Sequence, residues 1–236
     1  MTHFNVTVVS DTVCPWVSCL PFRCTYPILT IFQCYIGKNK LDRGIAAYRA
    51  AHPDTKDTFS QAWLPFYLNP NAPAKGVDKS QYYKDKFGEQ RTAMIFERLT
   101  AVGKSVGINF KFGGKTGNTR DSHRLIQLGK SKSPEVQTKV VEALFKAYFE
   151  NEKDLTSHEV LREAGVNAGL EEEEVKAWLE SDKGGEEVDK EVREAQRKDI
   201  SGVPNFTLQG KYEIGGAQDP EAFVQIFERI KEVEGS

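Results

Sequence analysis

The four cysteines of this 236-residue chain lie at positions 14, 19, 24 and 34, and none of the later residues is a cysteine. A disulfide scaffold would distribute its cysteines along the chain, so the cluster argues against that class of fold. The stretch Cys14-Pro15-Trp16 has the form of the opening of a Cys-x-x-Cys redox motif. The second cysteine of such a motif would follow at once, but Cys34 arrives only after seventeen further residues, Val17–Gln33.

Composition narrows the class of protein. Hydrophobic residues make up 39% and charged residues 28%, as in ordinary globular proteins. The net charge of −2 gives no electrostatic footprint for nucleic acid or an anionic membrane, and no apolar stretch approaches a membrane span of about 20 residues.

The start of the chain, Met1–Thr12, lacks the basic and apolar segments of a signal peptide, so we expect a cytoplasmic location. The cysteine spacing is unlike that of a zinc site, and we predict no metal and no resident cofactor.

Hydrophobic patterning predicts the first elements. Phe4–Val9 alternates apolar and polar residues and is rich in β-branched types, which predicts a strand. A helix is expected from Tyr35 to about His52, because Leu41, Ile45 and Tyr48 recur at helical spacing. Residues 58–68 are a plausible second strand.

The middle of the chain has helical periodicity. Thr156–Gly165 opens with a capping signal and closes on glycine, which predicts a short helix ending there. The last part returns to strands, with a hairpin signal at Gln209-Gly210 and a final helix. The predicted fold is therefore α/β: a split unit, 1–70 and 200–236, interrupted by a helical insertion domain, 71–199.

The thioredoxin fold has this outline, with its cysteine pair after the first long strand and at the start of a helix. A helix N-terminus carries partial positive charge and favours the thiolate nucleophile. Such folds place a proline, preceded by a cis peptide bond, opposite the cysteines. Pro204 after Val203 is the candidate here, and the alternative is an ordinary proline at a strand edge.

Five segments together resemble the DsbA-like family of the FrnE type: SDTVCPW with CYIGKNKLD, PFYLNPNAP, NTRDSHRLI, SGVPNF and IGGAQDPEAF. The resemblance covers nearly the whole chain except residues 17–33. It implies a thioredoxin domain interrupted by a helical domain, and thiol–disulfide oxidoreductase activity. The related 2-hydroxychromene-2-carboxylate isomerases and kappa-class glutathione transferases generally carry serine where this chain has Cys14, which favours the disulfide branch.

The resemblance also implies roles for individual residues. Cys14 matches the attacking cysteine and Cys34 the resolving one, while Pro15 and Trp16 match the intervening pair. Val203 and Pro204 match the backbone that docks an extended substrate. His123 matches a position near the site, and the alternative is a histidine packed between the helical domain and the core.

Removing Val17–Gln33 joins the flanks as SDTVCPWCYIGKNKLD, which restores the motif. The segment has one charged residue, Arg23, and no periodicity. Val17-Ser18 can be encoded as a 5′ splice sequence and Phe32-Gln33 as a 3′ one. We therefore predict a translated intron that keeps the reading frame; the alternative is a genuine loop insertion. Either way we expect a preserved scaffold, a disordered or poorly packed insertion and impaired thiol exchange.

Three functions remain open from the sequence. The first is a thiol–disulfide oxidoreductase acting on protein or small-molecule thiols and disulfides. The second is a glutathione-dependent isomerase or transferase, with glutathione as co-substrate and Cys14 in the serine position. The third is a catalytically inactive isoform or binding module. The sequence predicts neither a nucleic-acid nor a membrane partner, and it does not reveal the oligomeric state.

Overall fold

The computed structural model describes residues 1–14, 17–18, 30–31, 34–200 and 202–234. The chain divides into two compact units. We call the first the sheet unit; it comprises Met1–Ser10, Cys14–Leu64 and Ile200–Ser236. The helical unit comprises Asp11–Val13 and Pro65–Asp199. The sequence places the first boundary between the two domains after residue 70, whereas in the structure the helical unit's long segment begins directly after Leu64.

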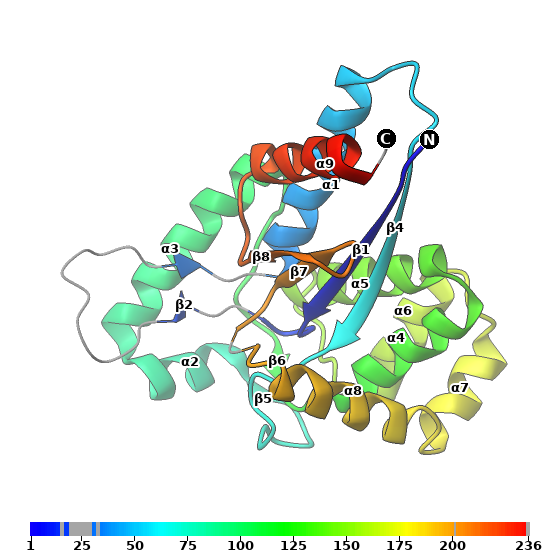
Figure 1. Ribbon diagram of the computed structural model, residues 1–236. Helices are drawn as coiled ribbons and strands as arrows, with labels where there is room; N and C mark the ends of the chain where they lie inside the picture. The colour runs from blue at the N-terminus through cyan, green and yellow to red at the C-terminus, as the bar shows by residue number, and fades with distance from the viewer. Residues whose placement is uncertain (15–16, 19–29, 32–33, 201, 235–236) are drawn as a thin grey trace. The chain divides into compact units, whose positions relative to one another are not determined.

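The sheet unit is built on four strands in the order β4-β1-β7-β8. Strands β1 and β4 run in the same direction (Figure 1), whereas β7 is antiparallel to both β1 and β8. Along β1 the side chains alternate between exposed and buried until Val8, after which all are buried. This alternation is the one that predicted the strand. The bounds are β1 His3–Ser10, β4 Thr58–Pro65, β7 Asn205–Leu208 and β8 Tyr212–Gly215.

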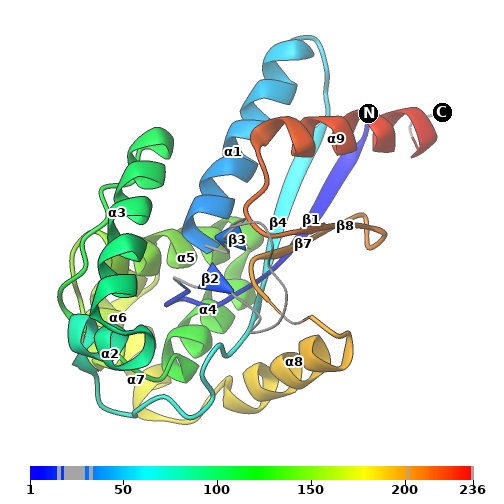
Figure 2. The same ribbon diagram turned by 90° about the vertical axis from the view of Figure 1, so that its left-hand side faces the viewer.

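Helices α1 (Cys34–Ala51) and α9 (Pro220–Glu234) pack against each other in this unit (Figures 1 and 2). The approach is close because Gly44 of α1 has no side chain: a Cβ there would lie 2.8 Å from Cβ of Phe223. The predicted apolar face of α1 is confirmed, since its three marker residues are buried. An aromatic cluster fills the core next to them, formed by Phe4, Tyr48, Phe59 and Phe227.

The predicted hairpin is also confirmed. Strands β7 and β8 pair directly, with Leu208 opposite Tyr212. The turn residues Gln209 and Gly210 have φ values of 52° and 68°. Two successive positive φ values are typical of the tight turns whose twist matches that of the flanking strands, and glycine adopts them without strain.

The helical unit is described by seven helices and one short antiparallel ladder. In the ladder, β5 (Val77–Asp78) pairs with β6 (Lys115–Thr116). The core mixes aliphatic and aromatic side chains and comes mainly from α4 and α5, which pack along each other. The helices are α2 Lys79–Phe87, α3 Glu89–Val106, α4 Arg120–Lys132, α5 Pro134–Phe149, α6 His158–Asn167, α7 Glu172–Glu180 and α8 Gly185–Arg197.

Two predicted boundaries are wrong. The second strand ends at Pro65 rather than at residue 68, because proline has no N–H to extend a ladder and the following backbone bonds to side chains instead. Helix α6 continues to Asn167 and does not end on Gly165. Gly165 is buried inside the helix, where an added Cβ would lie 3.0 Å from Val175. Close packing therefore explains this glycine better than helix termination.

Only the ends of the predicted insertion fall within the described residues. Val17–Ser18 (β2) pairs antiparallel with Thr30–Ile31 (β3). These two described segments of the insertion therefore lie side by side. The expected disorder of the rest of the insertion concerns residues outside the described ranges.

Candidate active site

Cys14 is the first residue of the sheet unit after β1, and its sulfur faces the strand region that contains the predicted proline. Its Sγ lies 3.5 Å from the carbonyl oxygen of Val203, to which the thiol donates. Cys14 is 0% exposed and Val203 1% exposed. These two residues are 189 positions apart in the chain, so their contact is a property of the fold.

The Val203–Pro204 peptide bond is cis. Pro204 packs against the first turns of α1, because a Cβ built on Gly37 would lie 2.8 Å from its Cγ. Helix α1 begins at Cys34, which is 1% exposed. The same short segment, Val203–Pro204, therefore contacts the Cys14 sulfur and the helix that Cys34 begins.

This geometry can support thiol chemistry. Cys14 and Cys34 are both buried, and neither forms a disulfide in the structure. The first turn of α1 holds no acidic residue that would oppose a thiolate. The two other predicted site residues, Pro15 and Trp16, lie outside the described residues.

His123 belongs to the helical unit, on α4, and is 3% exposed. Its Nε2 is 3.2 Å from the carbonyl oxygen of Phe66. A carbonyl only accepts, so Nε2 carries the proton. The same nitrogen is 3.5 Å from Oδ1 of Asp11. The ring of Tyr67 lies beside the imidazole, with the ring centroids 5.8 Å apart.

Asp11, in the helical unit, is a buried residue that the sequence reasoning did not single out. It is 1% exposed, and its Oδ2 accepts a hydrogen bond of 2.8 Å from the Leu68 amide. Its Oδ1 has no hydrogen-bond partner. Next to it, the hydroxyls of Thr12 and Ser122 are 2.7 Å apart. The sequence shows only two short polar residues shortly before Cys14, and their burial becomes visible in the fold.

The charged residues around His123 have structural partners. Arg124 is buried and donates to the backbone carbonyls of Trp178 and Lys183, which fixes the end of α7. Arg120 forms ion pairs with Asp182 and Asp189, and these partners raise the pKa of its guanidinium. The NTRDSHRLI segment thus ties α4 to its neighbours as well as presenting His123.

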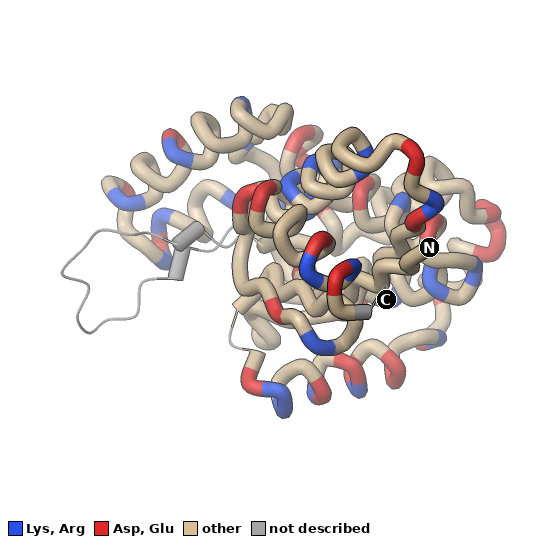
Figure 3. Tube along the Cα trace, turned by 45° about the horizontal axis from the view of Figure 1, so that its top comes forward, with Lys and Arg blue, Asp and Glu red and all other residues tan. Residues whose placement is uncertain are grey.

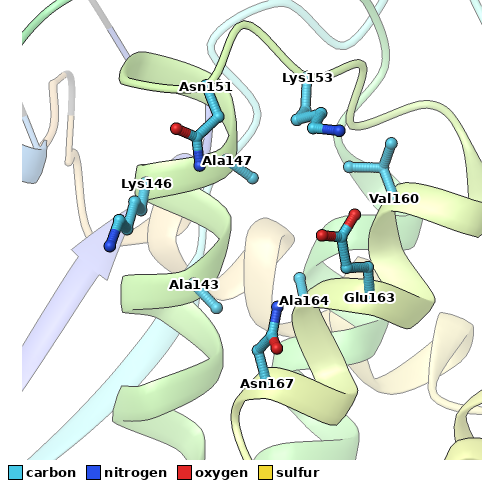
Figure 4. A pocket seen from close by; sticks show the side chains of 9 residues that line it. All are labelled: Ala143, Lys146, Ala147, Asn151, Lys153, Val160, Glu163, Ala164 and Asn167. Carbon is cyan, nitrogen blue, oxygen red and sulfur yellow. The ribbon is translucent and has the colours of Figure 1, made fainter.

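A depression of about 370 Å³ lies between α5 and α6 (Figure 4). Its floor is made of alanines, of which Ala164 is buried. Its polar side chains are all exposed, so it presents no fixed hydrogen-bonding group; they are Lys146, Asn151, Lys153, Glu163 and Asn167.

Charge gives no further candidate site. Acidic and basic residues are interspersed along the chain (Figure 3), in keeping with the net charge of −2. Within the described ranges, no three His, Cys, Asp or Glu side chains assemble in a way that could hold a metal ion. None of the helices described is both long and apolar enough to cross a bilayer.

The model of the DsbA-like thioredoxin domain matches residues 33–228. The chain belongs to the DsbA-like thioredoxin domain family. The match starts at the last residue of the predicted insertion, which is where a sequence alignment would break if Val17–Gln33 were foreign to the family. The predicted fold class, a thioredoxin fold interrupted by helices, is confirmed by this match together with the sheet and helices described above.

Solved structures extend the likeness of this DsbA-like chain. A probable DsbA oxidoreductase from Streptomyces coelicolor is 26% identical, with a TM-score of 0.79, and the alignment covers 98% of this chain and 91% of that one. A 2-hydroxychromene-2-carboxylate isomerase is 12% identical, with a TM-score of 0.63 and coverage of 98% and 99%. The cytosolic disulfide reductase DsbM from Pseudomonas aeruginosa is 13% identical, with a TM-score of 0.58 and coverage of 97% and 99%. No curated protein matches the chain.

Proposed function

We propose that this DsbA-like chain is a thiol–disulfide oxidoreductase, with Cys14 as the nucleophile and Cys34 as the resolving cysteine. One observation carries the proposal: Val203–Pro204 contacts the Cys14 sulfur on one side and the start of the Cys34 helix on the other. The family match and the likeness to a probable DsbA oxidoreductase support it.

The reaction balances as two exchanges. The Cys14 thiolate attacks a substrate disulfide, forms a mixed disulfide and releases one substrate thiolate. The Cys34 thiolate then attacks the Cys14 sulfur and releases the second. The protein dithiol is oxidised and the substrate disulfide reduced, and the reverse sequence oxidises a substrate dithiol. The Val203 backbone would dock the substrate chain, and Pro15, Trp16 and His123 remain predicted substrate-binding residues.

The activity of this form is expected to be impaired. Both cysteines are almost fully buried, with residue exposures of 0% and 1%, whereas an attacking thiolate must reach its substrate. The insertion also replaces the two-residue spacing that holds a Cys-x-x-Cys pair at disulfide distance. The scaffold that would position the pair does not depend on the insertion, since α1 is held by α9 and Pro204.

A comparison of the full chain with a variant lacking residues 17–33 tests the proposal. Insulin reduction and thiol titration are measured for both, and Cys14→Ser and Cys34→Ser are made in the shortened chain. We expect the shortened chain to be faster and both serine variants to lose the activity. An active Cys14→Ser variant would refute the assignment of the nucleophile, and equal rates for the two lengths would refute the impairment.

A second candidate is a glutathione-dependent isomerase or transferase. The likeness to 2-hydroxychromene-2-carboxylate isomerase and to DsbM, whose structure has also been solved with glutathione, favours testing it. Isomerisation of 2-hydroxychromene-2-carboxylate with glutathione present is the assay. Turnover that survives Cys34→Ser but needs Cys14 would favour this reading, because an isomerase needs no resolving cysteine.

We further propose that residues 17–33 are a translated intron, which the start of the family match at residue 33 supports. We also propose that the protein works in the cytoplasm on thiol and disulfide partners, without nucleic acid or a membrane. The fold shared with a cytosolic disulfide reductase supports the cytoplasmic location. Gene sequencing tests the intron: codons at Val17-Ser18 or Gln33 that cannot form splice signals would exclude it. Cell fractionation tests the location.

A further inference from the structure

Helix α1 carries a buried lysine one turn after Cys34. Lys38 is 7% exposed, although lysine is rarely found in a protein interior. It lies close to the N-terminus of the helix, where the helix dipole disfavours a cation. The residue before it, Gly37, packs against Pro204. Lys38 thus belongs to the same turns of α1 as the proposed resolving cysteine, and its burial needs an explanation.

A carboxylate on the next turn of the helix holds the ammonium of Lys38. The Nζ atom lies 2.5 Å from Oδ2 of Asp42, whose side chain is 39% exposed. Gln61 of β4 donates to the other carboxylate oxygen of Asp42, with its Nε2 3.3 Å from Oδ1. These three residues all belong to the sheet unit. A well-packed apolar side chain in place of a buried ion pair often gives equal or greater stability, so stability alone does not account for this lysine.

The position of Lys38 along the helix gives it a second possible partner. Cys34, Lys38 and Asp42 are spaced four residues apart, so they share one face of α1. Residues at this spacing have their Cβ atoms about 5–6 Å apart. The flexible four-carbon stem of lysine lets its ammonium reach a partner on either side. A thiolate at Cys34 therefore places a negative charge on the opposite side of Lys38 from Asp42.

The charges around this face of α1 are arranged to leave that choice to Lys38. The first turn of the helix holds no acidic residue that would oppose a thiolate. Asp42 is therefore the anion that competes with Cys34 for the ammonium. Other ion pairs of the sheet unit lie away from this face: Lys40 with Asp219, His52 with Glu228 and Lys231 with Asp57.

We propose that Lys38 is a positioning residue that stabilises the thiolate of Cys34, and that Asp42 holds its ammonium until that thiolate forms. This inference deepens the proposed function and rests on it, because the Cys34 thiolate performs the second exchange. On ionisation the Cys34 proton passes to water, and Lys38 keeps its charge. The thiolate then bonds to the Cys14 sulfur while the bond from Cys14 to the substrate sulfur breaks, so the substrate leaves as a thiolate.

The test measures the ionisation of Cys34 in the full-length chain carrying Cys14→Ser, Cys19→Ser and Cys24→Ser. The thiolate is followed by its ultraviolet absorbance as a function of pH, and the absorbance of the same protein with Cys34→Ser is subtracted. Lys38→Met removes the ammonium and keeps most of the length of the side chain. Lys40→Met is the matched control, because it makes the same change of charge two residues further along the same helix.

We expect Lys38→Met to lower the ratio of thiolate to thiol about tenfold at a given pH, the effect of losing one opposite charge at short range. Lys40→Met should leave the midpoint of the profile close to that of the parent. Equal midpoints for the two variants would overturn the proposal. Insulin reduction by the shortened chain tests the proposed function, whereas these profiles contain no exchange step, so the two can fail separately.

Asp42→Asn distinguishes this role from a structural one, and it keeps the test usable if Lys38→Met does not fold, since Asp42 is partly exposed. A pair that only stabilised α1 would be broken by either substitution, and both would then act in the same direction. We expect Asp42→Asn instead to raise the ratio of thiolate to thiol, because the released ammonium becomes available to Cys34. In a chain that already carries Lys38→Met it should have little effect. A shift of the same sign as that of Lys38→Met, or an undiminished shift in the double variant, would overturn the proposal.

Discussion

Lys79, the first residue of α2, gives the helical unit a stability that depends on pH. Lys79 is 2% exposed, and its Nζ donates to the backbone carbonyl of Tyr148 at 3.1 Å. The same nitrogen lies 4.1 Å from the centroid of the Tyr148 ring. Burial lowers the pKa of Lys79 to about 8, against a partial rise from the charge of Glu152. The unfolded chain binds this proton with a pKa of about 10.4.

The sign follows from the two pKa values. Between pH 8 and about 10.4 the unfolded chain keeps a proton that the folded chain has lost, so the free energy of unfolding rises with pH. Below pH 8 the folded state carries the full penalty of the buried charge. A difference of about 2.4 pKa units corresponds to about 3 kcal/mol, a large part of a typical stability of about 5–15 kcal/mol.

Lys79→Met replaces the buried ammonium with an apolar side chain of similar length. We expect the variant to be more stable than the parent protein at pH 7 and to lose about 3 kcal/mol of that advantage by pH 10. Urea unfolding followed by circular dichroism at pH 7, 8, 9 and 10 measures the difference. Lys176→Met, at an exposed position on α7, is the matched control and should show no such trend. A Lys79→Met difference that stays constant with pH would refute the reasoning.

Two further predictions concern the sheet unit. Gly37→Ala places a methyl group 2.8 Å from Cγ of Pro204. We expect the free energy of unfolding in urea to fall by about 1–3 kcal/mol, and insulin reduction by the shortened chain to become slower. Gly215→Ala is the control, because its methyl group meets open space, and it should change neither value. Asp57 is buried, and although burial raises its pKa, hydrogen bonds led by that from Lys231 hold it well below the usual range. Asp57→Asn should cost about 2 kcal/mol at pH 7. The difference should shrink as pH falls below about 4 and should be lost only as pH falls through the lowered pKa of Asp57; a difference as large at pH 2 as at pH 7 would contradict the linkage.

The sequence predicted elements whose signal is local. Helix α1 follows from three apolar residues on one face, and the hairpin follows from Gln209-Gly210, because each pattern is written within a few residues. The predictions failed where residues distant in the sequence determine the local structure. Helix α6 continues through Gly165, and a glycine suits this position because Val175 packs closely against it. No local pattern in the sequence reveals that neighbour.

The candidate site was predictable only in part for the same reason. The cysteines and Val203–Pro204 stand in recognisable motifs. Asp11 and Thr12 do not, because Asp11 takes its partner from Leu68, 57 residues away, and Thr12 takes its partner from Ser122, 110 residues away. Short polar residues after a strand are common in any loop, so their anchoring role becomes visible only when the fold brings those partners to them.

The insertion separates the stability of the scaffold from the chemistry of the cysteine pair. Closing a longer unconstrained connection costs only about 0.6 kcal/mol for each doubling of its length. Going from two intervening residues to nineteen is about three doublings, hence about 2 kcal/mol, which a fold held by α1, α9 and the sheet can absorb. The same 2 kcal/mol would lower the closure of a Cys14–Cys34 disulfide about thirtyfold. The pairing of Val17 with Ile31 returns part of that loss by joining the two ends of the insertion. If the proposed function holds, we therefore expect a chain of this kind to keep its fold and to lose chiefly the step in which the second cysteine resolves the mixed disulfide.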